Sequence, residues 1–209
     1  SGHTDQEASA ILGVPKYGLA YWMGGIREVF EEAGILLAYD KSGKIISFNS
    51  PSIKQRFTEY REALNKREIN LLEICRKEEL TLATDQMYYY RVTPIVMPRR
   101  FDTRFFICRA PAEQEPIIDN HEVVSQCWVN PDEALRKQRE EGFQIFFPTI
   151  KNIQGLTGHE QSQSLLEAIA LSRDLPRILP VKAEKEGAPP LIPGDEGYEH
   201  HEIATPHYF

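Results

Sequence analysis

The chain has 209 residues, of which 41% are hydrophobic, and its formal net charge is −7. This length and composition can bury one sizeable core, so we expect a single domain over residues 1–209. The acidic balance and the lack of a long basic run argue against a nucleic acid polymer bound through a broad basic surface, and no apolar run reaches the length of a membrane span.

Cysteine usage and the ends of the chain bear on its compartment. Cys75, Cys108 and Cys127 are odd in number and lack C-x-x-C spacing, which predicts reduced core thiols rather than a disulfide framework or a zinc site. The first residues show no signal-peptide pattern, and the last three show no retention or peroxisomal signal. These features predict a cytoplasmic protein without a membrane partner.

The first long element is a helix predicted over 18–33, after a short helical turn at 8–12. Glu28, Glu31 and Glu32 fall within an arc of about 100° on this helix. Gly34 can take the left-handed conformation that ends a helix, and the Gly24-Gly25 pair indicates close approach of another backbone, either for packing or for a phosphate. The opposite side is apolar, with Leu19, Trp22, Met23, Ile26, Val29, Phe30 and Ala33.

The acidic face lies at an unfavourable end of its helix. In the last two turns the helix dipole is already negative, and Glu28 and Glu32 repel each other at i,i+4; only the Arg27 to Glu31 pair offsets this. An ordinary solvated face, which is the alternative interpretation, should carry Lys or Arg here. The pattern therefore favours a bound cation, and Mg²⁺ or Mn²⁺ suits carboxylate ligands at i, i+3, i+4 spacing.

The rest of the chain predicts short elements of both kinds. Extended pieces at 35–38 and 44–48 flank a turn at 40–43, and two amphipathic helices follow within 52–80. The sequence then predicts strands at 87–95, 102–108 and 122–129, helices at 131–141, 148–156 and 160–173, a hairpin joining 177–181 to 191–193, and a polar tail from about 198.

A cationic cluster precedes the second of these strands. Arg99, Arg100 and Arg104 lie close together in the sequence, and guanidinium groups match phosphate oxygens in pairs. The cluster could bind the phosphate or diphosphate of a substrate. The alternative is an edge strand that charge keeps from pairing with another chain.

The segment 27–35, which reads R-E-V-F-E-E-A-G-I, resembles the second half of the Nudix box, the motif of hydrolases that cleave a diphosphate linked to another moiety. Gly13 stands at the spacing of the first glycine of the box, while Leu19 occupies its glutamate position. The stretches R-R-F-D-T-R-F-F at 99–106, E-V-V-S-Q-C-W at 122–128 and L-I-P-G-D-E at 191–196 resemble the subgroup containing the mammalian peroxisomal coenzyme A diphosphatase, in which an insertion splits the box.

The resemblance implies an α/β fold of Nudix type, with a mixed sheet flanked by helices and a helical insertion at about 52–80. The family's strands before the box helix have no counterpart here. Either they are missing from this chain, or the protein builds its sheet from the remaining strands alone. The resemblance also implies that Glu31 and Glu32 hold Mg²⁺ or Mn²⁺, while Glu28 completes the coordination or takes a proton from the attacking water. Arg27 would hold these carboxylates in place, and Glu122 is the candidate for one further metal-binding acid.

The function implied is metal-dependent hydrolysis of a nucleoside diphosphate derivative, a small-molecule substrate, with coenzyme A or an acyl-coenzyme A favoured. Leu19 keeps a second class open, a catalytically inactive Nudix-fold binding module. A third possibility is a Nudix hydrolase of ADP-ribose, dinucleotides or nucleoside triphosphates.

Overall fold

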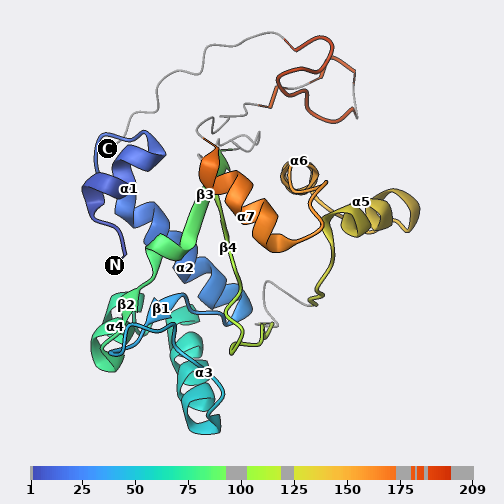
Figure 1. Cartoon of the computed structure of the whole chain (residues 1–209). Helices are drawn as coiled ribbons and strands as arrows, with labels where there is room; N and C mark the ends of the chain where they lie inside the picture. Colours follow the sequence, from blue (N-terminus) through green and yellow to red (C-terminus); the bar gives the residue numbers. More distant parts are fainter. Residues whose placement is uncertain are drawn as a thin grey trace. The chain divides into compact units, whose positions relative to one another are not determined.

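The computed structural model describes residues 2–92, 103–118, 125–172, 180–181, 183–185 and 188–198. The chain divides into two compact units, Ser1–Tyr89 with Phe106–Trp128 and Tyr90–Phe105 with Val129–Phe209. Figure 1 shows the elements of both units.

The first unit begins with two packed helices, α1 (Asp5–Leu12) and α2 (Gly18–Ala33). A capping box starts α1: the Glu7 amide donates to Thr4 Oγ1 at 3.2 Å, and the Thr4 amide donates to Glu7 Oε2 at 2.8 Å. From the first turn of α1, the Asp5 carboxylate accepts hydrogen bonds from the amides of Tyr17 and Leu19 at 3.0 and 3.1 Å. An acid of α1 therefore caps the start of α2, where the helix dipole favours negative charge.

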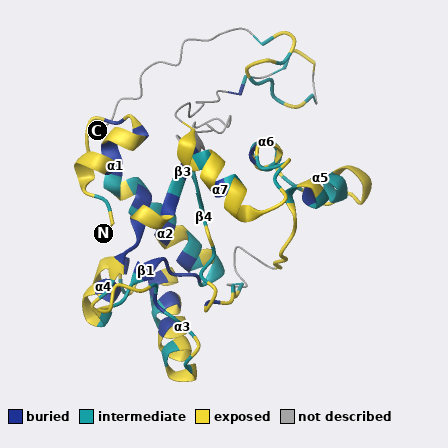
Figure 2. Ribbon diagram, in the orientation of Figure 1, coloured by how far each residue is buried: buried dark blue, intermediate teal, exposed yellow. Residues whose placement is uncertain are grey.

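The predicted helix over 18–33 is confirmed, and its apolar stripe fixes its rotation. Trp22, Ile26 and Phe30 are almost fully buried, and the Trp22 ring lies 4.7 Å from the ring of Phe106. Figure 2 shows buried and exposed residues interleaved along α2, as expected of an amphipathic helix. Gly34 ends the helix at φ 69°, as predicted.

Of the glycine pair inside α2, only Gly25 is approached closely, and by side chains rather than by another backbone. A Cβ atom on Gly25 would lie 3.0 Å from Met87 Cε and 3.2 Å from Phe106 Cδ2, whereas one on Gly24 would meet nothing within 4 Å. The prediction of a close backbone approach is therefore wrong at both positions. Gly25 makes room for core side chains that come from two later strands.

Two small sheets are present in the described part of the chain. Strand β1 (Ala38–Tyr39) pairs antiparallel with β2 (Thr81–Leu82), and the 3₁₀ turn η1 (Thr84–Gln86) leads from β2 into β3. Strand β3 (Met87–Val92) neighbours β4 (Arg104–Cys108), close to the strands predicted there.

The strand predicted over 122–129 is wrong across its described part. Residues 125–129 are exposed and have no strand structure, and the backbone hydrogen bonds among the described residues include none to them. Residues 122–124 lie outside the described residues. Cys127 is consequently exposed, which corrects its assignment as a core thiol. Cys75 and Cys108 are more enclosed, and burial raises the pKa of both thiols.

The segment predicted as a helical insertion, about 52–80, forms α3 (Pro51–Asn65) and α4 (Leu71–Glu78), and is called the insertion below. A capping box between Asn70 and Glu73 starts α4. Arg56 and Tyr60 on α3 both reach Glu78 on α4, at 2.9 Å in each case. These contacts tie the two inserted helices to each other.

The second unit contains α5 (Pro131–Glu140), α6 (Phe147–Gln154) and α7 (Ser162–Leu171), close to the three helices predicted there. An antiparallel bridge joins Val181 to Leu191, in agreement with the predicted hairpin. None of the helices in the described residues of either unit is long and apolar enough to span a bilayer.

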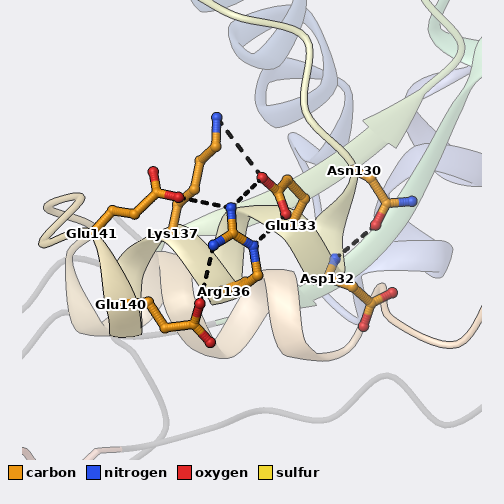
Figure 3. Close-up of polar contacts among 7 residues, drawn as sticks. All are labelled: Asn130, Asp132, Glu133, Arg136, Lys137, Glu140 and Glu141. Atoms are coloured by element: carbon orange, nitrogen blue, oxygen red, sulfur yellow. Dashed lines mark hydrogen bonds and ion pairs between the residues drawn. The ribbon is translucent and has the colours of Figure 1, made fainter.

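Figure 3 shows why α5 is locally well specified. The Asn130 side chain accepts a hydrogen bond from the Asp132 amide at 2.9 Å and caps the helix. Arg136 donates two hydrogen bonds of 2.7 Å to the carboxylate of Glu133 and also reaches Glu140 and Glu141. These contacts raise the pKa of Arg136 and lower that of Glu133.

Candidate active site

The acidic face of α2 is turned away from the core. Glu28 and Glu32 are exposed, and Glu31 is intermediate, with a side chain that is 23% exposed. This orientation follows from the burial of Trp22 and Phe30 on the other side of the helix. The three carboxylates therefore lie on one face, as the sequence predicted.

Arg27 lies between two of these acids. Its guanidinium contacts the Glu28 carboxylate, and its Nε lies 3.6 Å from Glu31 Oε1 at the predicted i,i+4 spacing. The Arg27 side chain is 48% exposed, so this ion pair is partly screened by water. Arg27 therefore contacts two of the three acids, whereas the helix spacing predicted only the pair with Glu31.

A cleft of about 1200 Å³ opens beside this face, and the insertion forms its other side. The four residues Arg27, Glu28, Glu31 and Glu32 line it from α2. The remaining lining comes mainly from the insertion and includes Thr58, Arg61, Glu62, Asn65, Lys66, Arg67, Glu68, Ile69, Asn70 and Glu73, with Ile117 and Ile118 from a later loop. The two inserted helices thus shape the space in front of the acids.

Arg61, like Lys66 and Arg67, lines this cleft but was not predicted from the sequence as a site residue. It is only 7% exposed, and it donates from Nε to the Glu31 carbonyl oxygen at 2.9 Å and from Nη2 to the Glu32 carbonyl oxygen at 2.7 Å. The sequence contains one possible signal, an arginine on the apolar side of an amphipathic helix near Phe57 and Leu64. Buried arginines need several acceptors, so such a position indicates a specific partner.

Two further cations lie in the cleft, at the end of α3. Lys66 and Arg67 follow the last helical residue, and Arg67 has φ 60°. Neither side chain makes an ion pair within the part of the chain that the structure describes. They add positive charge to a cleft that Glu62, Glu68 and Glu73 also line, besides the acids of α2. The cleft's other two arginines, Arg27 and Arg61, are already engaged with α2.

The three glutamates suit a hard divalent cation by residue type, because Mg²⁺ and Mn²⁺ prefer carboxylate oxygen. Among the described residues, however, no group of three or more His, Cys, Asp or Glu side chains is close enough to hold a metal ion. Glu28 and Glu31 turn toward Arg27 instead. Because side chains at i, i+3 and i+4 are neighbours on a helix, rotation of these side chains, without movement of α2, can bring their oxygens together.

The other predicted site residues lie elsewhere. Arg104 is in β4, is partly buried and belongs to the second unit. Arg99, Arg100 and Glu122 lie outside the described residues. Leu19, at the glutamate position of the motif, lies in the first turn of α2 and does not line the cleft.

Comparison with known proteins places these features in context. The family model of the NUDT19 Nudix domain matches residues 3–156. Proteins named acyl-coenzyme A diphosphatase NUDT19 are similar to the chain: the one from Xenopus laevis is 29% identical over 193 residues, which cover 83% of this chain and 49% of that protein. The one from Homo sapiens is 27% identical over 209 residues, covering 93% and 55%. The chain thus spans about half the length of the curated relatives it matches.

A solved structure confirms the fold. A Nudix hydrolase from Alicyclobacillus acidocaldarius superposes with a TM-score of 0.53 at 23% sequence identity, over 68% of this chain and 63% of that one. The predicted α/β fold of Nudix type is therefore confirmed.

Proposed function

The chain belongs to the family of the NUDT19 Nudix domain, and on that premise we propose that it hydrolyses the diphosphate bond of coenzyme A or an acyl-coenzyme A. With coenzyme A the products would be 3′,5′-ADP and 4′-phosphopantetheine, water supplying the oxygen to one phosphorus. The choice of substrate is supported by relatives that are named acyl-coenzyme A diphosphatases.

The observation that carries this proposal is the acidic face of α2 in an open cleft. Glu31 and Glu32 would hold Mg²⁺ or Mn²⁺ with Glu28, and such an ion, when bound, neutralises charge on a diphosphate and acidifies water. Glu28 either completes this ligand set or takes the proton from the attacking water. In the second role it would leave Arg27, with which it is paired.

The remaining residues of the cleft would bind and orient the substrate. Arg27 holds Glu31 through its Nε and limits the directions that this carboxylate can take. Lys66 and Arg67 supply positive charge to the anionic parts of the substrate that lie away from the acids. That Arg99, Arg100 and Arg104 bind a phosphate of the substrate stays a separate prediction from the sequence.

A second candidate function rests on Leu19. Because this leucine replaces a carboxylate of the Nudix motif, the chain could bind a nucleotide derivative without cleaving it. Leu19 lies nine residues before Glu28, about 13 Å along the axis of an α-helix. The two functions predict the same ligand class and differ only in turnover.

The experiment is a hydrolysis assay with Mg²⁺ or Mn²⁺ on coenzyme A, an acyl-coenzyme A, ADP-ribose, a dinucleotide and a nucleoside triphosphate, with products identified by mass spectrometry. We expect cleavage of coenzyme A derivatives first, and a loss of roughly 100-fold or more in kcat for Glu31→Gln and Glu32→Gln.

Glu59→Gln is the matched control. Glu59 is an exposed acid of α3 that hydrogen-bonds Gln55 and does not line the cleft, so its replacement should change kcat by about twofold or less. Faster cleavage of ADP-ribose or a triphosphate would reject the substrate. Binding of coenzyme A without cleavage would favour the inactive module.

A further inference from the structure

The last turn of α2 has a donor for each of its four final carbonyl groups. The final four carbonyl oxygens of a helix have no partner within it, apart from an amide of the cap. Here the Gly34 amide donates to the Phe30 oxygen at 3.0 Å, and the Ile117 amide donates to the Ala33 oxygen at 2.8 Å. The two carbonyl oxygens between these, those of Glu31 and Glu32, both accept hydrogen bonds from Arg61.

Arg61 is thus bound to the backbone of two proposed metal-binding residues at once. The two donor atoms of one rigid, planar guanidinium are held at a fixed separation and meet two successive carbonyl oxygens, at 2.9 and 2.7 Å. A lysine ammonium carries the same charge but cannot reproduce this planar fork. The contact therefore fixes the orientation of the peptide groups of this turn as well as its charge.

The charge of Arg61 is also placed where α2 needs it. The C-terminal end of a helix is its negative end, and three glutamates add to that charge. The positive guanidinium offsets both, and its burial reduces screening by water. Arg61 mirrors Asp5, which caps the opposite, positive end of α2 from α1.

Gly34 makes room for this arrangement. A Cβ atom at Gly34 would lie 3.2 Å from Arg61 Nη1, a contact tight enough to shift the guanidinium. Gly34 thus has two reasons to be glycine: its φ of 69° and the proximity of Arg61.

We propose that Arg61 is a positioning residue of the active site: by holding the carbonyl groups of Glu31 and Glu32, it sets the direction in which their carboxylates enter the cleft and so their affinity for a divalent cation. The inference rests on the proposed function. It makes the insertion, through α3, a part of the catalytic apparatus.

The test is titration of Mn²⁺ into the full chain, followed by calorimetry, together with melting temperature, kcat and KM. In Arg61→Lys we expect Mn²⁺ affinity to fall by about fivefold or more, since an outer residue that orients metal ligands typically contributes about 10–100-fold. At saturating Mn²⁺, kcat should fall by about tenfold, with a smaller change in KM.

Arg56→Lys is the matched control. Arg56 is on the same helix and makes its own ion pair at 2.9 Å, but with Glu78 of α4. It should lower the melting temperature without changing Mn²⁺ affinity beyond about twofold. Equal Mn²⁺ affinity in wild type and Arg61→Lys would overturn the role proposed for Arg61 and leave the metal site standing. Absence of Mn²⁺ binding to the wild type would overturn the metal site and this proposal together.

A second pair of variants decides the matter if Arg61→Lys does not fold. Gly34→Ala keeps Arg61 but crowds its guanidinium, whereas Gly43→Ala imposes a similar backbone strain at φ 77° with nothing within 4 Å of the added Cβ. We expect Gly34→Ala to weaken Mn²⁺ binding by about twofold or more, and Gly43→Ala to leave it unchanged. Equal Mn²⁺ affinity in these two variants would overturn the role assigned to Arg61.

Discussion

At the scale of single residues, two arginines contact the three glutamates of the site in different ways. Arg27 contacts Glu28 and Glu31 by its side chain, while Arg61 reaches the backbone of Glu31 and Glu32. The first arginine is about half exposed and the second is buried. They should therefore respond differently to mutation: Arg27 mainly in activity, and Arg61 in both activity and stability.

Arg27→Lys tests whether Arg27 affects activity more than stability. An exposed ion pair contributes only about 0.3–0.5 kcal/mol, so the melting temperature should change by a few degrees at most. The planar guanidinium that contacts Glu31 through Nε and Glu28 through Nη2 is lost, however, and misplacing a reacting group by about 1 Å can cost about 100-fold in rate. We expect kcat at saturating metal to fall by more than about tenfold.

Melting and rate should be measured on the same preparation of Arg27→Lys. Full turnover in a folded variant would show that Arg27 is a surface residue without influence on the acids. A loss of turnover that follows the loss of folded protein would likewise contradict a positioning role.

At the scale of elements, helix ends determine much of this structure. Each end of α2 is capped by a charged side chain from another helix, whereas α5 carries its own cap, Asn130, and its own ion pairs around Arg136. A helix with local caps can be specified by its own sequence. A helix capped from outside depends on the packing of its neighbours.

The ion pairs of α5 predict a dependence of stability on pH. Hydrogen bonds from Arg136 lower the pKa of Glu133 in the folded protein, below a usual value of about 4.3. The pair therefore contributes stability above the unfolded pKa, and the contribution is lost as pH falls through the lower, folded pKa. Arg136→Gln should melt about 1–3 °C below wild type at pH 7 and together with it near pH 2.5.

Arg139→Gln on the same helix is the control for this measurement. Arg139 makes no ion pair within the described residues, so its replacement should shift the melting temperature by less than about 1 °C at either pH. A deficit of Arg136→Gln that is as large at pH 2.5 as at pH 7 would contradict the assignment to Glu133.

At the scale of the whole molecule, charge poses a problem for the proposed substrate. The chain carries a net charge of −7, and coenzyme A is itself an anion with several phosphates. Binding therefore needs local positive charge near the acids. Lys66 and Arg67 supply it within the cleft, from the end of α3.

The double variant Lys66→Ala, Arg67→Ala should raise the KM for coenzyme A by about fivefold at low salt and leave kcat within about twofold, because it removes attraction and no reacting group. The effect should shrink at 0.5 M salt, where charges are screened within a few ångströms. The measurement is KM at two ionic strengths.

The control is the double variant Lys41→Ala, Lys44→Ala, which removes the same charge from a turn that does not line the cleft. The KM of this control for coenzyme A should stay within about twofold of the wild-type value. A matching rise in KM for both double variants would assign the effect to net charge and contradict the assignment to the cleft.

What could be predicted from the sequence is local. The helix over 18–33, its glycine stop, its acidic face and the Arg27 to Glu31 pair depend on residues within one or two turns of each other, where helix geometry alone fixes neighbours. The same holds for α5, α6 and α7. A motif at the end of that one helix was also enough to indicate the Nudix family, which the family model confirms. The solved structure confirms the fold.

The tertiary structure decided what the rest of the chain contributes to that helix. Arg61 lies 30 residues from Glu31, and Asp5 lies 14 residues from Leu19, so neither contact follows from periodicity. The strand expected over 122–129 is absent from its described part, residues 125–129, for the same reason, since a strand needs a partner that its own sequence does not specify. Local sequence placed the acids on α2, whereas helix packing determined which residues cap its ends and which inserted side chains face the acids across the cleft.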